Sequence, residues 1–362
     1  MLDGAPEQDT IEVSVFGPGR GESIAVHLGG GDWIVVDSCK NQVTKRVIVL
    51  DYLRVIGVDV ENKVHLVVAT HAHDDHFAGI SAVFEACRSA RFVCPAALGI
   101  PEFLALTDLE EREYAGLPVR AYAEYRKVFE IVEERGFASF DPIDFAMAKM
   151  ELLNIRSEPL ISRVVALSPC SRAYKQAQRA IRKAYLASSE SPGYFRSVDP
   201  NQLAVALWVE TAEKRLLLGA DLLKGPRGSG WDAVVASFRP DSRASLFKIP
   251  HHGSSNAHWG GVWSNLVARE TTAVLTPFRL GAKSIPKETD RERILSLAAD
   301  AYISAPALIA ASTLAVRREA AAMGPLARSP RDPWGVPGQI RARSRAGAPE
   351  WVVELDPPAQ HL

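Results

Sequence analysis

Apolar and polar positions near the start of the chain follow the two-residue period of half-buried β-strands. Three such segments are expected, at residues 11–16, 23–28 and 32–36. A segment with helical spacing follows at residues 43–56, and residues 64–69, apolar except for His65, are typical of a strand buried on both faces. This order predicts a sheet that begins with three antiparallel strands and has helices packed outside it.

The rest of the chain is expected to divide into a helical insertion, further strands and a C-terminal extension. Residues 101–141, rich in Glu, Tyr, Ala and Arg, predict a helical insertion over the sheet edge. Strand patterns return at residues 163–167, 203–209, 215–218, 246–249 and 272–276, followed by a helix at 290–299 and a strand at 301–304. We therefore expect one main domain over residues 11–310. The Pro- and Arg-rich residues 324–362 predict an irregular extension in which 351–355 forms an edge strand.

Composition and charge exclude several classes of protein. Of the 362 residues, 47% are hydrophobic and 23% are charged, which is typical of a globular protein. The 42 Lys and Arg residues balance 43 Asp and Glu residues, so no global positive field attracts nucleic acid. Residues 1–10 are polar and the apolar runs are short, which predicts neither a signal peptide nor a membrane span. The 4 cysteines form no C-x-x-C pair, and a reducing, cytoplasmic location is expected.

A dense group of metal-binding residue types follows the buried strand at residues 64–69. Histidines 71 and 73 are two positions apart, so an extended chain points His71 and His73 to the same side. Asp75 and His76 come next, where the chain is expected to bend into a helix near Phe77. This spacing predicts ligands for two ions about 3.5–4 Å apart, as in two-metal hydrolases. The alternative is an exposed polar turn that is rich in histidine.

Two later motifs also stand where strands end. The pair His251-His252 follows the strand expected at residues 246–249, and Asp221 follows the strand at 215–218. A carboxylate in that position can bridge two cations, since each oxygen takes one ion, although N-capping of a helix is the alternative reading. His252 is the expected ligand of the second ion, while His251 either orients His252 or protonates a leaving group.

These motifs resemble the metallo-β-lactamase fold superfamily over about residues 11–310. The residues that carry the resemblance are His71, His73, Asp75, His76, Gly79, Asp221 and a late histidine. The resemblance implies an α+β fold, a four-layer αββα sandwich with the helical insertion, and two divalent metal ions, zinc or manganese. It also implies that Asp37, at the end of the strand at 33–36, supports the metal-binding loop from behind.

Within that superfamily the chain is similar to the lactamase-like domain of bacterial competence DNA-uptake proteins. The matching residues are Leu167-Ser168-Pro169, Asn201, Ala220-Asp221 and the run from Lys248 to Ser254. The chain departs from many superfamily members because no histidine lies between His76 and His251 to bind the first ion. By position Asn201, or its neighbour Asp199, replaces it, and an oxygen ligand shifts the preference towards manganese or a similar ion.

The resemblance implies hydrolysis by a metal-activated hydroxide, with Asp75 as both ligand and proton acceptor and Asp221 as the bridge. The resemblance to the DNA-uptake domain favours a phosphodiester substrate, with nucleic acid as the expected example. Four cations at helical spacing also favour it, because they predict a phosphate-binding face: Arg172, Lys175, Arg179 and Arg182. The alternative is a solvated helix face. Two other functions remain open. One is hydrolysis of a small lactone, thioester or cyclic phosphodiester, and the other is a binding module without metal. The residues identify no protein partner, including one encoded in the same operon.

Overall fold

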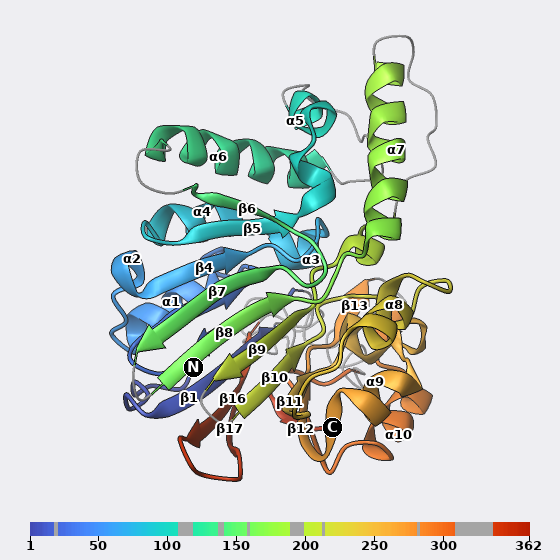
Figure 1. Ribbon diagram of the computed structural model, residues 1–362. Helices are drawn as coiled ribbons and strands as arrows, with labels where there is room; N and C mark the ends of the chain where they lie inside the picture. Colours follow the sequence, from blue (N-terminus) through green and yellow to red (C-terminus); the bar gives the residue numbers. More distant parts are fainter. Residues whose placement is uncertain are drawn as a thin grey trace, which may run out of the picture.

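The computed structural model in Figure 1 describes residues 1–17, 21–107, 119–136, 141–157, 160–188, 199–211, 214–280, 283–307 and 336–362. Two eight-stranded sheets lie face to face within these ranges. The order of the first is β17-β16-β1-β2-β3-β4-β5-β6, and that of the second is β18-β15-β12-β11-β10-β9-β8-β7.

The strands of the first sheet are β1 (Thr10–Gly17), β2 (Ser23–His27), β3 (Trp33–Val36), β4 (Val64–Val68), β5 (Arg91–Pro95), β6 (Ile143–Ala146), β16 (Gly338–Arg345) and β17 (Val352–Asp356). Those of the second are β7 (Glu151–Ser157), β8 (Leu160–Ala166), β9 (Leu207–Thr211), β10 (Lys214–Leu218), β11 (Ala244–Lys248), β12 (Val267–Leu275), β15 (Asp300–Ile303) and β18 (Gln360–His361). A small separate hairpin joins β13 (Phe278–Leu280) to β14 (Lys283–Ile285).

The α-helices of the described chain are α1 (Ile48–Val55), α2 (Val60–Lys63), α3 (Asp74–Phe77), α4 (Ile80–Ala86), α5 (Pro101–Thr107), α6 (Val119–Arg135), α7 (Ser171–Ser188), α8 (Gly230–Ser237), α9 (Gly260–Asn265) and α10 (Glu288–Leu295). Single turns of 3₁₀-helix are η1 (Ala96–Gly99), η2 (Pro200–Leu203), η3 (His251–Gly253) and η4 (Ser255–Ala257).

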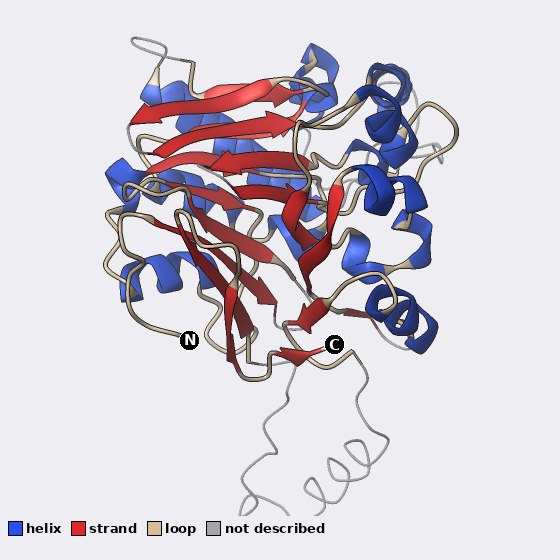
Figure 2. Ribbon diagram, turned by 60° about the horizontal axis from the view of Figure 1, so that its bottom comes forward, coloured by secondary structure: helices blue, strands red, loops and turns tan. Residues whose placement is uncertain are grey.

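The two sheets lie between layers of helices (Figure 2). Three apolar cores lie between these four layers. Side chains such as Val68 and Leu216 fill the central core between the two sheets. A second core, which includes Phe84 of α4 and Tyr125 of α6, covers the outer face of the first sheet. Trp231 of α8 belongs to a third core on the outer face of the second sheet. The predicted αββα sandwich is thus confirmed, because each sheet buries one face against the other sheet and the opposite face under helices.

Parallel pairing brings the ends of several strands to one edge of the sandwich. In the first sheet β3, β4, β5 and β6 run parallel, and in the second β10, β11, β12 and β15 do so. The segments that leave β3, β4, β10 and β11 therefore emerge together. These segments carry the residues that the sequence analysis singled out.

Local turns alter several of the expected elements. The helix expected at residues 43–56 begins only at Ile48, because the Asn41 side chain accepts hydrogen bonds from the amides of Val43 and Thr44 and holds a turn. The helix expected near Phe77 is two helices, α3 and α4, separated by Gly79 with a φ of 88°. Strands β5, β6 and β7 were not predicted, and β9 begins later than expected because η2 precedes it.

The helical insertion is present as α5 and α6, and residues 108–118 and 137–140 of it lie outside the described chain. Buried aromatic side chains, including Phe103 of α5 and Tyr125 of α6, fix these helices on the outer core of the first sheet. The amphipathic α7 joins the same core through Ala177 and Ile181. The insertion therefore packs as a part of the outer helical layer.

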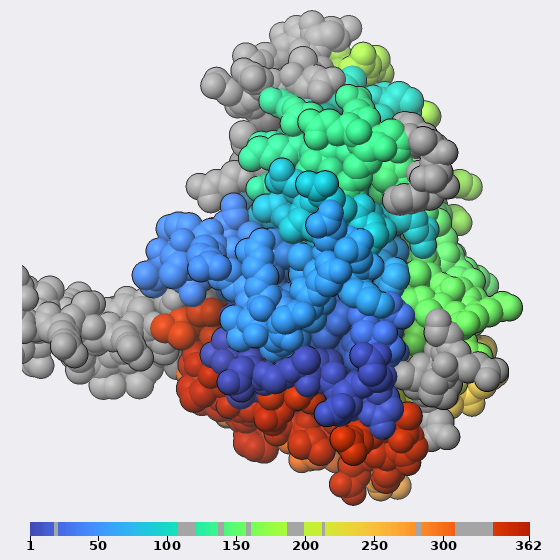
Figure 3. Space-filling model, turned by 90° about the vertical axis from the view of Figure 1, so that its left-hand side faces the viewer, coloured from blue at the N-terminus to red at the C-terminus, as the bar shows by residue number. Residues whose placement is uncertain are grey.

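The prediction of irregular structure around residues 341–345 is wrong. These residues form β16, which lies between β1 and β17 in the first sheet. Arg341 is buried and pairs with Glu354, and Arg343 pairs with the buried Glu12. Figure 3 shows this red segment directly beside the blue N-terminal strands. Residues 351–355 were expected as an edge strand, and β17 confirms that expectation.

The described helices include none with both the length and the apolar character needed to span a bilayer. All 4 cysteines are free thiols: Cys39, Cys87 and Cys94 are buried, and Cys170 is partly exposed. Burial raises the pKa of the Cys39 thiol to about 12, so this thiol near the strand ends is neutral at physiological pH.

Candidate metal centre

Three histidines after β4 lie together at the strand-end edge. His71 Nε2 lies 3.1 Å from His73 Nδ1, so the two rings turn a nitrogen towards the same point, as their spacing predicts. His76 comes from the short helix α3, and its ring centroid is 4.4 Å from that of His71. His71 and His76 are buried, whereas His73 is partly exposed.

Asp221 connects this group to the second sheet. It follows β10 and is buried, with Oδ1 3.4 Å from His76 Nε2 and Oδ2 3.8 Å from His71 Nε2. His252, after β11, places Nε2 3.5 Å from Asp221 Oδ2 and 3.3 Å from Asp75 Oδ2. Oδ1 of Asp221 thus faces His76, and Oδ2 faces His71 and His252, so this carboxylate lies between histidines from both sheets.

His251 and Asn201 complete one side of the cluster. His251 Nε2 lies 4.0 Å from Asp221 Oδ2 and 3.3 Å from Asn201 Nδ2, and its Nδ1 lies 2.7 Å from Asn256 Oδ1. The residue that orients the His252 ring is Thr276, whose carbonyl oxygen and hydroxyl are each 3.1 Å from His252 Nδ1.

The outer nitrogens of the buried rings face oxygen atoms. Asp37 Oδ2 is 2.7 Å from His76 Nδ1 and also accepts a hydrogen bond from Thr70 Oγ1, which lies 2.9 Å from His71 Nδ1. If each Nδ1 carries a proton, it donates a hydrogen bond to the neighbouring oxygen. The Nε2 lone pairs of His71 and His76 then face the centre. This is the arrangement by which proteins orient histidine ligands, and Asp37 has the supporting position that the resemblance implied.

Several buried polar atoms at the centre have no hydrogen-bond partner in the described chain. They are His76 Nε2, His252 Nε2, Asp221 Oδ1 and Asn201 Oδ1. An unpaired buried polar atom costs about 1–3 kcal/mol, so several such atoms facing one another need a shared partner. A divalent cation fits, because imidazole nitrogens and carboxylate oxygens are its usual ligands. Ligand atoms of His71, His73 and Asp221 lie within 4.8 Å of one another, and so do those of Asp37, His71 and His76.

The charge states of the cluster suit cation binding. Burial, reinforced by the neighbouring His76, keeps the pKa of His71 well below its ordinary value. Burial also lowers the pKa of His76, but Asp221, Asp37 and Asp75 outweigh it and raise that pKa to about 10. Burial would raise the pKa of Asp75 and Asp221, but nearby histidines hold both below the usual range. At neutral pH the carboxylates are ionised and His71 is neutral, while a cation must displace the proton of His76.

A buried ion pair lies next to the centre and holds the loop that carries Asp221. Lys248 Nζ lies 2.6 Å from Glu22 Oε1 and 3.1 Å from the carbonyl oxygen of Ala220, next to Asp221. The other oxygen of Glu22 accepts a hydrogen bond from the Thr276 hydroxyl. Sequence reasoning missed the supporting residues Glu22 and Thr276, since each lies far along the chain from its partners.

Backbone strain is concentrated at the same place. Of the 6 described non-glycine residues with positive φ angles, 4 lie here: Asp37 (60°), Ala220 (45°), His251 (47°) and His252 (54°). Such a conformation costs about 1–3 kcal/mol for each residue, and it persists where surrounding contacts enforce it. The strand ends are therefore bent to aim particular side chains inwards.

The four cations expected to bind phosphate lie exposed along α7: Arg172, Lys175, Arg179 and Arg182. Arg172 Nη1 donates to the carbonyl oxygen of Arg227, and Arg182 Nε lies 2.9 Å from Glu102 Oε1. The opposite face is buried at Ala177 and Ile181 as predicted, but Tyr185 is 39% exposed. The helix contacts η2, which carries Asn201, and extends outwards from there (Figure 1).

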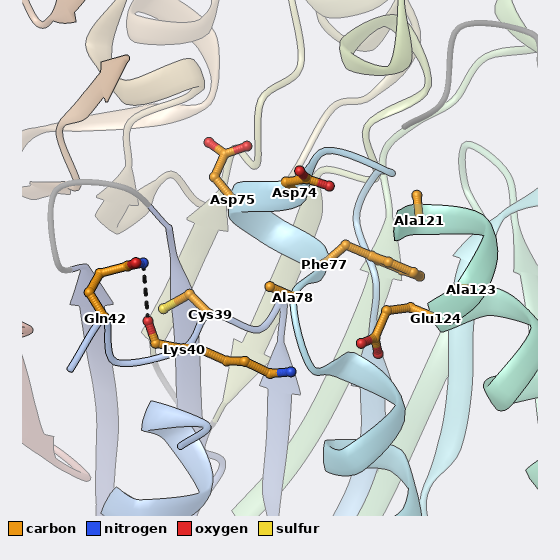
Figure 4. Close-up of a pocket in the computed structure, with 10 residues that line it drawn as sticks. All are labelled: Cys39, Lys40, Gln42, Asp74, Asp75, Phe77, Ala78, Ala121, Ala123 and Glu124. Carbon is orange, nitrogen blue, oxygen red and sulfur yellow. Dashed lines mark hydrogen bonds between the residues drawn. The ribbon is translucent and has the colours of Figure 1, made fainter. Parts of the chain in front are cut away.

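A cavity of about 380 Å³ opens beside Asp75 (Figure 4). Its walls come from the loop after β3, which carries Lys40, from α3, and from α6 of the helical insertion, which carries Ala121 and Glu124. Glu124 Oε2 accepts hydrogen bonds from the amide and hydroxyl of Ser81. The insertion thus forms one wall of a space next to the cluster.

Comparisons with known proteins add only distant structural likenesses. No family model and no curated protein matches the sequence. The metallo-β-lactamase fold protein YhfI from Bacillus subtilis aligns with a TM-score of 0.39 and 11% identity, over 82% of this chain and 95% of that one. Zinc-bound PqqB from Methylobacterium extorquens aligns with a TM-score of 0.37 and 11% identity, over 79% of this chain and 86% of that one. A mutant of the CmlA β-hydroxylase aligns with a TM-score of 0.39 and 12% identity, over 94% of this chain and 55% of that one. With TM-scores this low, the interpretation of the site rests on its own geometry.

Proposed function

We propose that this chain is a dinuclear metal-dependent hydrolase that cleaves phosphodiesters, with nucleic acid as its substrate. The observation that carries the proposal is the convergence of buried, unpartnered ligand atoms from both sheets around Asp221. A binding module without metal would leave these atoms unsatisfied, which is costly in a buried site. A cation-dependent reaction centre accounts for the histidine nitrogens and the Asp221 oxygen among them.

The residues divide into two groups around the Asp221 carboxylate. His71 and His73 would hold one zinc or manganese ion, Asp75, His76 and His252 would hold the other, and Asp221 lies between the two groups. When bound, such a pair of ions would supply Lewis acidity and would lower the pKa of water enough to provide a nucleophile at neutral pH. We assign the proton released in the reaction to Oδ2 of Asp75. The Asp75 side chain is the more exposed of the two carboxylates, at 10% against 3% for Asp221.

The remaining residues position these groups. Asp37 fixes the ring of His76, and the carbonyl oxygen of Thr276 fixes the ring of His252. The ion pair of Lys248 with Glu22 holds the loops after β10 and β11 against the start of β2. Because these contacts are buried, the ligands need little reorganisation during the reaction, which favours electrostatic stabilisation of a charged transition state.

A nucleic acid substrate is supported by the cationic face of α7. Arg172, Lys175 and Arg179 follow one exposed side of the helix, which starts next to the centre. A nucleic acid bound at the centre could place its neighbouring phosphates against this row of cations, which would strengthen binding. A small neutral substrate bound at the centre would not reach them.

Reversing two of these charges tests the nucleic acid assignment. In Lys175→Glu with Arg179→Glu, we expect cleavage of single-stranded DNA at about 0.1 M salt to fall at least about tenfold, because log affinity depends on the number of phosphates neutralised. Cleavage of bis-p-nitrophenyl phosphate should stay within about twofold. The control is Arg54→Glu with Arg88→Glu, which reverses two exposed charges elsewhere. Equal loss in both pairs would contradict a role for α7.

The cavity beside Asp75 favours a second candidate function, hydrolysis of a small ester or cyclic phosphodiester. Its volume of about 380 Å³ suits a small molecule, and α6 supplies a wall. The two candidates differ in the first experiment. Metal-loaded protein is incubated with DNA, RNA and bis-p-nitrophenyl phosphate over a series of salt concentrations. Cleavage of polynucleotides that falls steeply with salt supports the nuclease, whereas salt-independent turnover of the small ester alone supports the second candidate.

A further inference from the structure

We infer that His251 binds the same metal ion as His71 and His73, through its Nε2 atom, so that the adjacent His251 and His252 serve different ions. The inference rests on the proposed metal centre and assigns the ligand that is missing from the sequence between His76 and His251. It replaces the two roles first considered for His251, which were to orient His252 and to protonate a leaving group.

Asp75 distinguishes the two adjacent histidines, whereas Asp221 Oδ2 faces both of them. Asp221 Oδ2 lies 3.5 Å from His252 Nε2, 3.8 Å from His71 Nε2 and 4.0 Å from His251 Nε2. His71 Nε2 lies 3.1 Å from His73 Nδ1. Since zinc–ligand bonds are about 2.0–2.2 Å long, two ligands of one ion lie roughly 3–4 Å apart. His252 Nε2 also lies 3.3 Å from Asp75 Oδ2, and we therefore assign it with Asp75 to the other ion.

The backbone explains how neighbouring residues can face one centre. In an extended strand, side chains at consecutive positions point to opposite sides. Here both residues have left-handed φ angles, 47° at His251 and 54° at His252, and the amide of His251 donates to the carbonyl oxygen of Ala220. The strained turn therefore brings both rings to the Asp221 carboxylate. Metal binding by both rings would compensate for the strain of these two φ angles.

The hydrogen bonds of His251 match those of the other ligands. Its Nδ1 is 2.7 Å from Asn256 Oδ1, which places the proton on Nδ1 and turns the Nε2 lone pair towards the centre. The amide of Asn201 approaches Nε2 at 3.3 Å, a long contact that an ion would replace. Between these two side chains, the imidazole is the better zinc ligand, because protein zinc sites use nitrogen, sulfur and carboxylate donors.

The assignment changes the expected metal. With Asn201 as the third ligand, the first ion would have an amide oxygen and a preference shifted towards manganese. With His251 it has three nitrogens and one carboxylate oxygen, a set that suits zinc. One ion would thus be bound by three imidazoles, although the chain has no histidine between His76 and His251.

Metal stoichiometry tests the inference independently of activity. The full-length protein is stripped with a chelator, titrated with Zn²⁺ and analysed for bound zinc, and Co²⁺ absorption reports the ligand field. The variants are His251→Ala and Asn201→Ala. His258→Ala is the matched control, since it removes a nearby, partly exposed histidine outside the cluster. If His251→Ala fails to fold, His251→Asn replaces it, because an amide preserves polarity at the site.

We expect two tight zinc ions in the wild type, in Asn201→Ala and in His258→Ala. In His251→Ala we expect one ion to be lost or bound more than about tenfold more weakly, with a changed Co²⁺ spectrum. Two ions in His251→Ala at wild-type affinity would overturn the inference, as would loss of an ion in Asn201→Ala alone or fewer than two ions in the wild type. Two ions without hydrolysis of any ester would instead refute the proposed function and leave this ligand assignment intact.

Discussion

Replacing His73 and Asp75 together by alanine is expected to remove metal binding and to lower ester hydrolysis by more than about 10³-fold, with the fold retained. Loss of a single electrostatic group from an active site already costs about 10²–10³ in rate, and this pair takes one ligand from each ion. The fold should persist, because His73 is partly exposed and neither side chain belongs to the three apolar cores.

Elemental analysis, circular dichroism and the rate with bis-p-nitrophenyl phosphate check this expectation. A suitable control is His65→Ala with Asp59→Ala, which removes the same two residue types from the opposite end of β4 and should leave metal content and rate unchanged. A metal-free double variant with the wild-type rate would contradict the proposed mechanism.

Replacing Lys248 by methionine is expected to lower the free energy of unfolding by about 3–5 kcal/mol. Lys248 is fully buried, and its loss leaves the carboxylate of Glu22 buried without its cation. Adding Glu22→Leu to the same chain should recover much of the loss, since it removes the uncompensated charge. Breaking one partner of a buried pair is costly, whereas replacing both with apolar groups often is not.

Chemical denaturation of the metal-free proteins measures these changes. Lys63→Met is the matched control, because Lys63 is 49% exposed and lies 3.8 Å from Asp32 at the surface. Exposed pairs of this kind contribute at most about 1 kcal/mol. Equal destabilisation by Lys248→Met and Lys63→Met would show that the buried pair does not stabilise the sandwich.

Sequence patterns predicted the parts of this protein that depend on nearby residues. The alternation of β1, β2 and β3 and the apolar run of β4 each reflect which faces of one strand are buried. The cluster from His71 to His76 was found because its ligands are close in sequence and follow a strand. Strands bring such local groups to a shared edge, and the prediction that His71, Asp221 and His252 form one centre depended on the order of strands together with the resemblance stated for the sequence.

Features that depend on distant partners were not predictable in this way. Arg341 and Arg343 suggested irregular chain, because no local pattern shows that Glu354 and Glu12 neutralise them inside a sheet. The ion pair between Glu22 and Lys248 is hidden for the same reason. The direction of His251 depends on positive φ angles, which residue types other than glycine rarely signal.

The position of β16 has a consequence for how the protein is made. Strand β1, Thr10–Gly17, pairs on one side with β2 but on the other with β16, Gly338–Arg345. At about 5–20 residues per second, the ribosome needs roughly 15–65 s to synthesise the chain between these strands. During that time one edge of β1 presents open hydrogen-bonding groups, which attract other strands. Until β16 emerges, this edge of β1 is therefore a place where the nascent chain can pair with a wrong strand.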